Sequence, residues 1–493
     1  MMSALAHRGP DAEGTFEPRT GTGCLGHKRL SIIDPAGGDQ PILLRDGGLA
    51  IVANGEIYNA PELRPQLLSQ HRLATRSDTE ILLHLYDDHG AQAVEYVSGM
   101  YAFAIADGDQ LFLARDPIGI KPLYYHQVDG VLRFASELKA FPAGTRGVRE
   151  FPPGTAYSSA GGFSTFYTIP DPDPLEDTTE AHIRQVRERL QDAVAKRLRS
   201  DVPVGAFLSG GLDSSIIAAL ARPHVEELHT FTVGTEGSLD LEAARLVARH
   251  LNTIHHEHVL APDEVATHLP HIIFALESFD QDLVRSAIPT YFTARLAAEH
   301  VKVILTGEGA DELFAGYRYY RDFADAHRLR RELRRSVTAL HNVNLQRVDR
   351  MTMAHSLEGR VPFLDLQMVE QSLAIPAQLK LSTQRMPEKW ILRAAVEDLL
   401  PPEVTWRDKE QFDEGSGTID LLAALIGDLT DGLDVASYRQ GHPDVWLRSA
   451  EECYYHRLLL DVFEDPELIT GNVGRWADRR IGPPDSKTTN PPE

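Results

Sequence analysis

A glycine-rich run, Ser209-Gly210-Gly211-Leu212-Asp213-Ser214-Ser215, is the strongest chemical signal in the chain. It lies between the apolar segment 204–208 and an apolar helix predicted from Ser214, so it is expected to join a strand to a helix. Two glycines allow backbone amides to approach an anion, and the amino end of the helix adds N–H groups and a positive dipole end. No GxxxxGK sequence is present, so the run is not a Walker loop. It predicts a phosphate-binding loop of another kind.

A second candidate is the acidic run Gly307-Glu308-Gly309-Ala310-Asp311-Glu312, which directly follows the apolar segment 301–306. Three carboxylates within five residues repel one another without a cation, so the run favours a divalent metal and an electrophile. RVPFLD at 360–365 and KEQF at 409–412 each place a cation beside apolar residues, and each alone is better explained as structural. His255-His256-Glu257-His258 follows a predicted helix as a short strand, and we interpret it as surface or packing.

Two hydrophobic patterns divide the chain into domains. Short apolar runs separated by turn residues, with a helix after Ser77 and Asp78, predict an antiparallel sheet with flanking helices in residues 1–165. Residues 166–178 are acidic and contain three prolines, as expected of a linker. Alternating strands and helices in 179–470 predict a parallel sheet with ligand loops at the carboxyl ends of its strands. Residues 471–493 are expected to be a disordered tail.

Individual elements of the second domain follow from the same patterns. We expect helices at 179–199, 214–221, 240–251 and 390–399 and strands at 204–208, 228–234 and 301–306, with mostly helical structure from about residue 320.

Composition narrows the class of protein. The 493 residues hold 49 basic and 72 acidic side chains, so the formal net charge is 49 − 72 = −23. This negative net charge disfavours a nucleic-acid-binding surface. No run approaches the ~18 apolar residues of a membrane helix, and the first residues have no secretory signal, so a cytoplasmic protein without a membrane partner is expected. The sequence contains two cysteines, Cys24 and Cys453, which are too few for a disulfide framework or a multi-thiolate metal site within this chain.

The order of the motifs resembles that of the glutamine-dependent asparagine synthetases. The resemblance extends to about residue 470 and rests on HRGPD (7–11), RLSIID (29–34), NGEIYN (54–59), RDPIGIKPLYY (115–125), SGGLDSS, GEGADE, RVPFLD and KEQF. The glycine-rich run resembles the pyrophosphate-binding loop of ATP pyrophosphatases. The resemblance implies an N-terminal α+β layered sandwich of the Ntn-hydrolase-like glutaminase type. It also implies a C-terminal α/β parallel sheet of the PP-loop, Rossmann-like type with added helices.

In that family the first domain releases ammonia from glutamine, and the second adenylates the aspartate side chain so that ammonia can attack it. The resemblance therefore implies aspartate, ATP and glutamine or ammonia as substrates, Mg²⁺ as cofactor, and a homodimer as a candidate assembly.

The family also implies roles for matching residues. The glutamine site would use Arg29 for the carboxylate, Ile32 as a pocket wall, Asn54 and Gly55 as the oxyanion hole, and Glu56 and Asp78 for the amino group. The ATP site would consist of Leu208, Ser209, Gly210, Gly211, Asp213, Ser214, Ser215, Val233, Thr306 and Gly307, with Asp213 and Asp311 holding magnesium. Glu308 would assist acyl-adenylate formation, and Lys409 would offset charge on the pentavalent phosphorus.

The chain departs from the family at its start. Family members begin with a cysteine that attacks glutamine and whose α-amino group is the base. Cys24 lies in CLGHKRL, which corresponds to a sheet strand, and cannot supply a terminal amine. We expect a start site assigned too late and an upstream segment that encodes Met-Cys. Glutamine would then be the nitrogen source, whereas ammonia would be the source if the chain starts at Met1.

A second departure concerns the acceptor. Many members have a Thr-Thr pair just before the arginine that matches Arg285, where this chain has Asp282-Leu283-Val284. β-Lactam synthetases share the fold but need a tyrosine–glutamate pair, which the sequence alone does not locate. Gly415 and Gly417 after KEQF favour the asparagine-forming branch. Two alternatives remain: a ligase or amidotransferase that adenylates another carboxylate in secondary metabolism, and a non-catalytic glutamine-binding protein.

Overall fold

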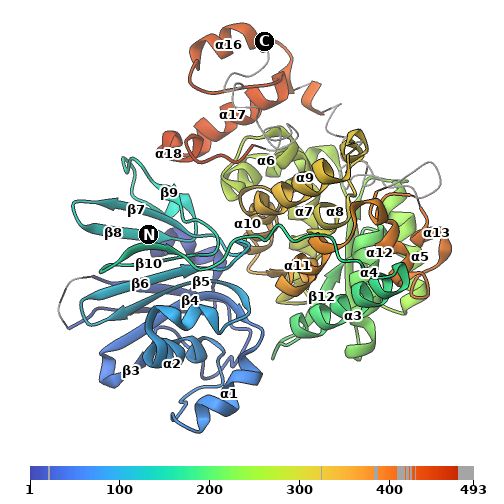
Figure 1. The fold of residues 1–493 in the computed structure, drawn as a ribbon. Coiled ribbons are helices and arrows are strands. Elements are labelled where there is room, and N and C mark those ends of the chain that lie inside the picture. The colour runs from blue at the N-terminus through green and yellow to red at the C-terminus, as the bar shows by residue number, and fades with distance from the viewer. Residues whose placement is uncertain are drawn as a thin grey trace.

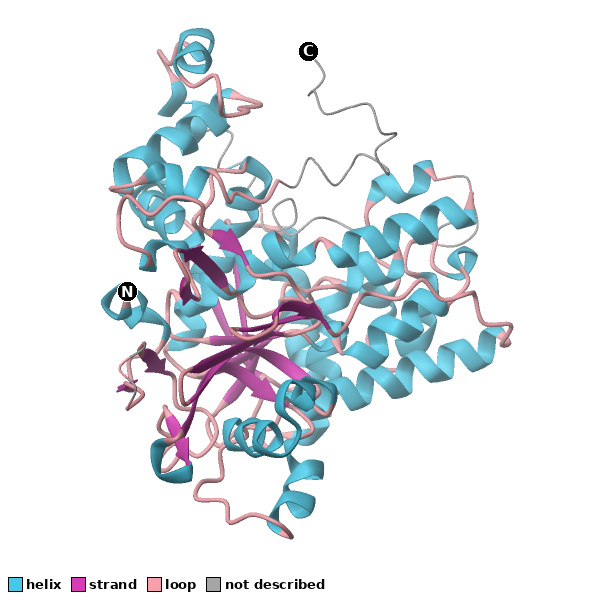
Figure 2. Cartoon of the chain, turned by 60° about the vertical axis from the view of Figure 1, so that its left-hand side comes forward, coloured by secondary structure: helices cyan, strands magenta, loops and turns pink. Residues whose placement is uncertain are grey.

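In the computed structural model, a strand-rich part of the chain is followed by a helix-rich part (Figures 1 and 2). The structure describes residues 1–19, 21, 23–323, 325–381, 387–407, 417, 421, 425–427 and 429–475. Within these ranges, no helix has both the length and the apolar character needed to cross a membrane. KEQF at 409–412 lies outside the described residues, as does the expected tail from residue 476 onward.

The strand-rich part contains three antiparallel sheets, with strand orders β11-β10-β6-β5-β4-β3, β8-β7-β9 and β1-β2. Its elements are β1 (Ala12–Phe16), β2 (Leu25–Arg29), β3 (Ile42–Leu44), β4 (Leu49–Ile57), α1 (Ala60–Leu68), α2 (Thr79–His89), β5 (Gly99–Asp107), β6 (Gln110–Arg115), β7 (Tyr124–Val128), β8 (Val131–Ala135), β9 (Arg149–Glu150), β10 (Thr155–Ser158) and β11 (Gly162–Thr165).

Both faces of the six-stranded sheet are buried. Successive side chains of its central strands point to opposite faces. On β4, Ile51 packs in one hydrophobic cluster with Leu82 of α2. The neighbouring Val52 faces the other way, into a cluster with Leu123 and Phe151 beside the β8-β7-β9 sheet. A helical layer and a second sheet therefore cover opposite faces, which confirms the layered α+β class predicted for this part.

The helix-rich part is built on a five-stranded parallel sheet of order β14-β13-β12-β15-β16. Its strands are β12 (Val204–Phe207), β13 (His229–Gly234), β14 (Ile254–Val259), β15 (Val303–Leu305) and β16 (Glu358–Arg360). Its helices are α3 (Thr179–Arg197), α4 (Leu212–Ala221), α5 (Leu239–Leu251), α6 (Pro262–Leu276), α7 (Gln281–Ala298), α8 (Ala310–Phe314), α9 (Ala326–Thr338), α10 (Asn344–Met353), α11 (Leu366–Ala374), α12 (Trp390–Val396), α13 (Pro402–Thr405), α16 (Val435–Gly441), α17 (Ala450–Val462) and α18 (Pro466–Thr470). Short 3-10 helices lie at Met2–Arg8, Arg45–Gly47, Gly90–Glu95, Leu138–Ala140, Arg222–His224, Arg318–Asp322, Leu340–Asn342, Pro362–Leu364 and Ala377–Leu379.

The strand order changes direction between β12 and β15. From β12 the chain continues outward through β13 to β14, and it then returns to the other side of β12 as β15. The loops that follow β12 and β15 therefore leave the sheet side by side and in opposite directions, which opens a crevice at the carboxyl ends of these strands.

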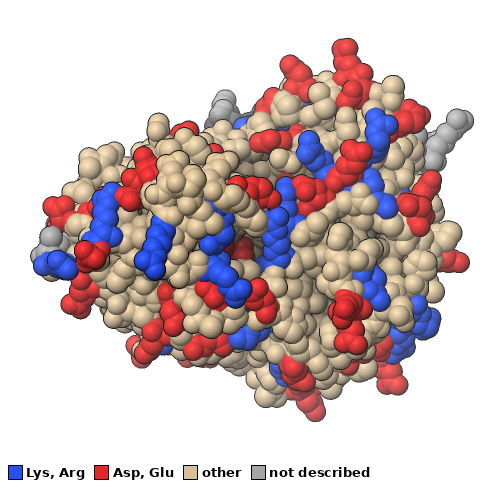
Figure 3. All heavy atoms as spheres, turned by 90° about the horizontal axis from the view of Figure 1, so that it is seen from below, with Lys and Arg blue, Asp and Glu red and all other residues tan. Residues whose placement is uncertain are grey.

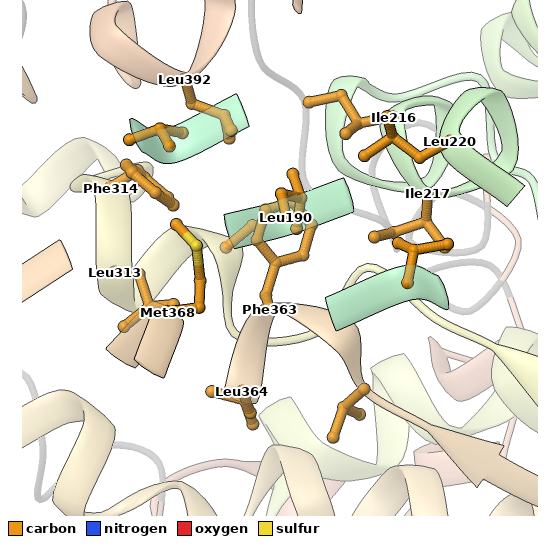
Figure 4. Close-up of a cluster of buried hydrophobic side chains, with 14 of the residues drawn as sticks. Leu190, Ile216, Ile217, Leu220, Leu313, Phe314, Phe363, Leu364, Met368 and Leu392 are labelled. Atoms are coloured by element: carbon orange, nitrogen blue, oxygen red, sulfur yellow. The ribbon is translucent and has the colours of Figure 1, made fainter. Parts of the chain in front are cut away.

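One hydrophobic cluster of this part packs α3, α4, α8 and α12 together (Figure 4). Ile216 and Ile217 of α4 are fully buried and share one cluster with Leu190 of α3, Phe314 of α8 and Leu392 of α12. The helix predicted from Ser214 begins at Leu212, and the one predicted for 390–399 is Trp390–Val396. The core-facing prediction for the latter is confirmed, because Leu392 has no exposed surface.

The segment 166–178 contains no helix or strand and lies along helices of the second part. The Leu175 amide donates to the Ala374 carbonyl at 2.9 Å, and Arg334 Nε donates to the Ile169 carbonyl at 2.9 Å. On the face shown in Figure 3, acidic and basic side chains are interspersed.

Candidate active site

The loops after β12 and β15 line a cavity of about 250 Å³ at the crevice in the parallel sheet. The residues expected at the ATP and metal site that line it are Leu208, Ser209, Gly211, Asp213, Ser214, Thr306, Gly307, Glu308 and Asp311. The two loops touch directly, because a Cβ placed on Gly307 would lie 2.9 Å from the Asp213 Cβ. A side chain at position 307 would push the two loops apart.

The glycine-rich run forms the turn from β12 into α4. Gly211 is the N-cap of α4, so the first N–H groups of the helix have no acceptor within the helix. Gly210 has φ +74°, and a Cβ there would lie 2.5 Å from the Ala243 carbonyl carbon. Ser209 Oγ lies 3.1 Å from Ser214 Oγ and closes the turn. The geometry suits a phosphate group, because backbone amides at a helix amino end face the cavity.

Asp213 and Asp311 face one another across the ammonium group of Lys389. Lys389 Nζ lies 2.6 Å from Oδ2 of Asp213 and 2.6 Å from Oδ1 of Asp311. Burial lowers the pKa of Lys389, but the two carboxylates outweigh burial and hold that pKa above its ordinary value. The ammonium occupies a position where two hard oxygen ligands converge, so the donor set fits Mg²⁺.

The acidic run divides among different partners. Glu308 forms an ion pair with Arg347 of α10. Glu312 is buried and accepts hydrogen bonds from Tyr317 Oη at 2.7 Å and from Asn344 Nδ2 at 3.2 Å. Burial, and then the nearby Asp311, raise the pKa of Glu312 to about 7. Of the three carboxylates in this run, the one that meets Asp213 at Lys389 is Asp311.

Three of the expected residues that the structure describes do not line the cavity. Gly210 supports the turn from behind, and the side chains of Ser215 and Val233 are fully buried, the latter in a hydrophobic cluster with Phe292. None of these three lines the cavity in the described part of the chain. Lys409 lies outside the described residues. Their places beside ATP stay predictions.

The cavity also contains residues that sequence reasoning missed. These are Asp240, Asp282, Ser286, Thr290, Tyr317, Asn344, Arg347, Lys389, Arg393 and Arg407 among others. Lys389 immediately precedes the helix that we interpreted only as core packing, so the available signal was its charge at a helix amino end. Tyr317 and Glu312 form a tyrosine–glutamate pair of the kind that the sequence did not locate, although only Tyr317 lines the cavity.

The arginine that follows the Asp282-Leu283-Val284 departure forms an ion pair with a distant helix. Arg285 on α7 pairs with Glu451 of α17, with Nε 2.9 Å from Oε1. Asp282, one turn earlier on α7, lines the cavity.

A second cavity, of about 120 Å³, lies in the strand-rich part. All six residues expected to bind glutamine line it: Arg29, Ile32, Asn54, Gly55, Glu56 and Asp78. Gln40, His27 and Ser77 line it as well, and Met353 and Glu358 reach it from the helix-rich part. The wall of this cavity is therefore contributed by both halves of the chain.

Asn54 and Gly55 provide the features of an oxyanion hole. Within the described residues, the Nδ2 atom of Asn54 is buried without a hydrogen-bond partner. Gly55 has φ +137°, and a Cβ there would lie 1.9 Å from the Met100 carbonyl oxygen. An unpartnered buried donor beside a strained glycine suits a transient negative oxygen.

Charged groups surround the second cavity. Arg29 donates from Nη2 to the Asp34 carbonyl at 2.7 Å and from Nη1 to Asp39 Oδ1 at 2.6 Å. Burial raises the pKa of Glu56 well above its usual range, with Asp78 adding to the rise and Arg360 opposing it. Burial also raises the pKa of Asp78. A cationic ligand group would therefore be favoured between these two carboxyls.

No cysteine lies among the described residues that line the second cavity. Cys24 is exposed and precedes β2, and its Sγ lies 3.5 Å from the Leu25 carbonyl oxygen.

Comparison with known proteins finds two families in this chain. Residues 185–325 and 321–471 match the asparagine synthase family, and residues 1–156 match a glutamine amidotransferase domain. The chain is 37% identical over 499 residues to asparagine synthetase [glutamine-hydrolyzing] of Asparagus officinalis, covering 94% of this chain and 82% of that protein. It is 39% identical over 489 residues to asparagine synthetase [glutamine-hydrolyzing] 2 of Arabidopsis thaliana, covering 94% of this chain and 83% of that protein.

Proposed function

This chain belongs to the asparagine synthase family, and its first 156 residues match a glutamine amidotransferase domain. We propose that it is an ATP-dependent ligase that forms asparagine. The aspartate side chain attacks the α-phosphorus of ATP, which gives β-aspartyl-AMP and pyrophosphate. Nitrogen drawn from glutamine then displaces AMP. The observation on which the proposal rests is that Asp213 and Asp311, from the first turns of α4 and α8, converge on one cation in the larger cavity.

The larger cavity has the groups that this chemistry needs. The amides at the start of α4 would bind the phosphates. Asp213 and Asp311 would hold Mg²⁺, which when bound offsets phosphate charge. Lys389 adds a second positive charge beside the same two carboxylates. Glu308, held by Arg347, would assist formation of the acyl-adenylate. By resemblance to the family, Lys409 would offset the negative charge on the pentavalent phosphorus.

The smaller cavity would bind glutamine. Arg29 would take the carboxylate of the ligand in exchange for Asp39, whose side chain is 71% exposed and free to move away. Glu56 and Asp78 would bind its amino group, and Ile32 would form an apolar wall. Asn54 Nδ2 and Gly55 would stabilise the oxyanion.

The same proposal includes a cytoplasmic location and a homodimer. Light scattering on the purified full chain measures the assembly directly, and a mass equal to one chain would exclude the homodimer.

The function is tested with the full chain, ATP, Mg²⁺, ammonium and aspartate, with pyrophosphate and asparagine measured in parallel. Pyrophosphate release should require aspartate, and Asp311→Asn should weaken the dependence on both Mg²⁺ and ATP. Asp109→Asn, on an exposed turn between β5 and β6, is the matched control and should behave like the unaltered chain. A carboxylate other than aspartate that supports faster release would place the protein in the alternative ligase class.

A further inference from the structure

Three imidazoles meet on the face of the parallel sheet that α7 covers. His229 is the first residue of β13, His256 lies on β14, and His300 follows the end of α7. Nδ1 of His229 lies 3.0 Å from Nε2 of His256, and the rings of His256 and His300 stack with centroids 3.9 Å apart. One ring nitrogen from each of the three lies within 4.8 Å of the other two.

The sheet register and α7 place the three residues together. His256 is the register partner of Phe231, which lies two residues after His229 on β13 and so points to the same face. Phe231 is fully buried, and its ring lies 5.0 Å from that of His256 and 5.8 Å from that of His300. The imidazoles therefore stand on a rigid aromatic floor at the edge of the sheet.

The three rings offer nitrogen ligands, because a neutral imidazole carries a lone pair on one of its two ring nitrogens. In the contact between His229 and His256, one ring donates its N–H proton to the other. If the donating ring changes tautomer, its proton moves to its other nitrogen. Both facing nitrogens then carry lone pairs that point to the same place.

We propose that His229, His256 and His300 bind a divalent transition metal, with Zn²⁺ as the best fit, and that the metal fastens the end of α7 to the edge of the parallel sheet. Imidazole nitrogens select such ions over Mg²⁺, which prefers oxygen. Zn–N bonds of about 2.0–2.1 Å require the three nitrogens to draw closer than 4.8 Å. His300 is exposed and is the ring that can turn inward. A water would complete the tetrahedron.

This site differs from the catalytic cavity in position and in consequence. His229 lies at the amino end of β13, whereas the cavity lies at the carboxyl ends of β12 and β15. α7 and Phe231 connect them, because Asp282 and Thr290 line the cavity from the same helix that ends beside His300, and Phe231 lines the cavity as well. A bound metal would therefore restrain this wall of the cavity.

The test uses the full chain without a histidine tag, stripped with chelator and returned to buffer that contains Mg²⁺. Calorimetric titration with ZnCl₂ should show one equivalent bound and a rise in Tm. His300→Ala should weaken zinc binding at least ~10-fold. X-ray absorption of the zinc complex should count three imidazoles in the unaltered chain and two in the variant.

The matched control is His255→Asn, because His255 is the chain neighbour of His256, points to the other face and contacts Thr230 Oγ1 at 2.9 Å. It should bind zinc like the unaltered chain. The proposal is overturned if the unaltered chain binds no zinc, or if His300→Ala and His256→Asn bind zinc as tightly as the unaltered chain does. It is also overturned if Asp311→Asn abolishes zinc binding. His300 is exposed, so its variant remains informative even if His256→Asn fails to fold.

Discussion

Glu56 of the glutamine amidotransferase domain and Arg360 of the asparagine synthase domain form a buried ion pair, with Oε1 and Nη2 2.8 Å apart. Arg360 Nε also lies 2.9 Å from Glu358 Oε1, and its Nη1 donates to the Arg197 carbonyl at 2.8 Å. Its side chain has no exposed surface. One guanidinium therefore connects the wall of the glutamine cavity to the edge strand of the parallel sheet.

Replacing Arg360 with methionine should destabilise the protein by about 3 kcal/mol, because Glu56 would stay buried without its cation and Glu358 would retain only Lys121, at 3.2 Å. Urea unfolding measures this loss. Arg146→Met is the control, since Arg146 is exposed and solvent screens its pair with Asp465, so its loss should change stability little. Equal unfolding midpoints for the two variants would show that the buried pair does not stabilise the interface.

Lys389→Met should lower the stability of the ligand-free protein, because Asp213 and Asp311 would then repel each other. Addition of Mg²⁺ and ATP should restore more stability to this variant than to the unaltered chain, since the metal replaces the lost cation. Differential scanning fluorimetry with and without Mg-ATP measures both effects. Lys389→Arg retains the charge and should show the smaller change.

Glu308→Gln and Glu312→Gln should differ although the two residues are close in the chain. Glu308 is an ionised partner of Arg347, so its variant should bind ATP normally but lose aspartate-dependent pyrophosphate exchange. Glu312 has a pKa of about 7 and is hydrogen-bonded to Tyr317, so a neutral amide resembles its protonated form and should retain exchange. If Glu308→Gln exchanged normally and failed only to form the amide, Glu308 would act in the nitrogen-transfer step instead.

Gly55→Ala should abolish glutamine binding to the full chain in a calorimetric titration, because its Cβ would lie 1.9 Å from the Met100 carbonyl oxygen and displace the Asn54–Gly55 strand. Synthesis from ammonium should persist, since Gly55 lines the smaller cavity and not the larger one. Gly108→Ala tests for strain alone. Gly108 has φ +60° with nothing within 4 Å of a Cβ, so its variant should cost only ~1–2 kcal/mol and retain activity.

His27 should make the protein less stable in acid. Burial lowers its pKa to about 4 from 6.5, so both folded and unfolded states are neutral at pH 7. As pH falls below 6.5, the unfolded state takes up a proton first, and stability declines until about pH 4, by at most ~3 kcal/mol. Unfolding midpoints between pH 7 and pH 4 should therefore fall less steeply for His27→Gln. Parallel curves for both proteins would contradict the assignment.

Short-range patterns in the sequence were sufficient for the local elements. Short apolar runs between turn residues predicted antiparallel strands, and the structure pairs β4 with β5. The run from Ser209 to Ser215 predicted a strand–turn–helix unit, and it forms one, because glycine conformations and helix capping act within a few residues. The order of short motifs was enough to select six residues that line one cavity.

Tertiary structure alone decided which charges meet. Lys389 reaches Asp213 from another helix, Arg360 reaches Glu56 from another domain, and His300 stacks on His256 from the end of α7. No spacing in the sequence signals such pairs, because they depend on how whole elements pack. The acidic run shows the same limit. Its three carboxylates are nearly adjacent in sequence, yet a loop and one short helix direct them to different partners, and only packing determines which partner each one finds.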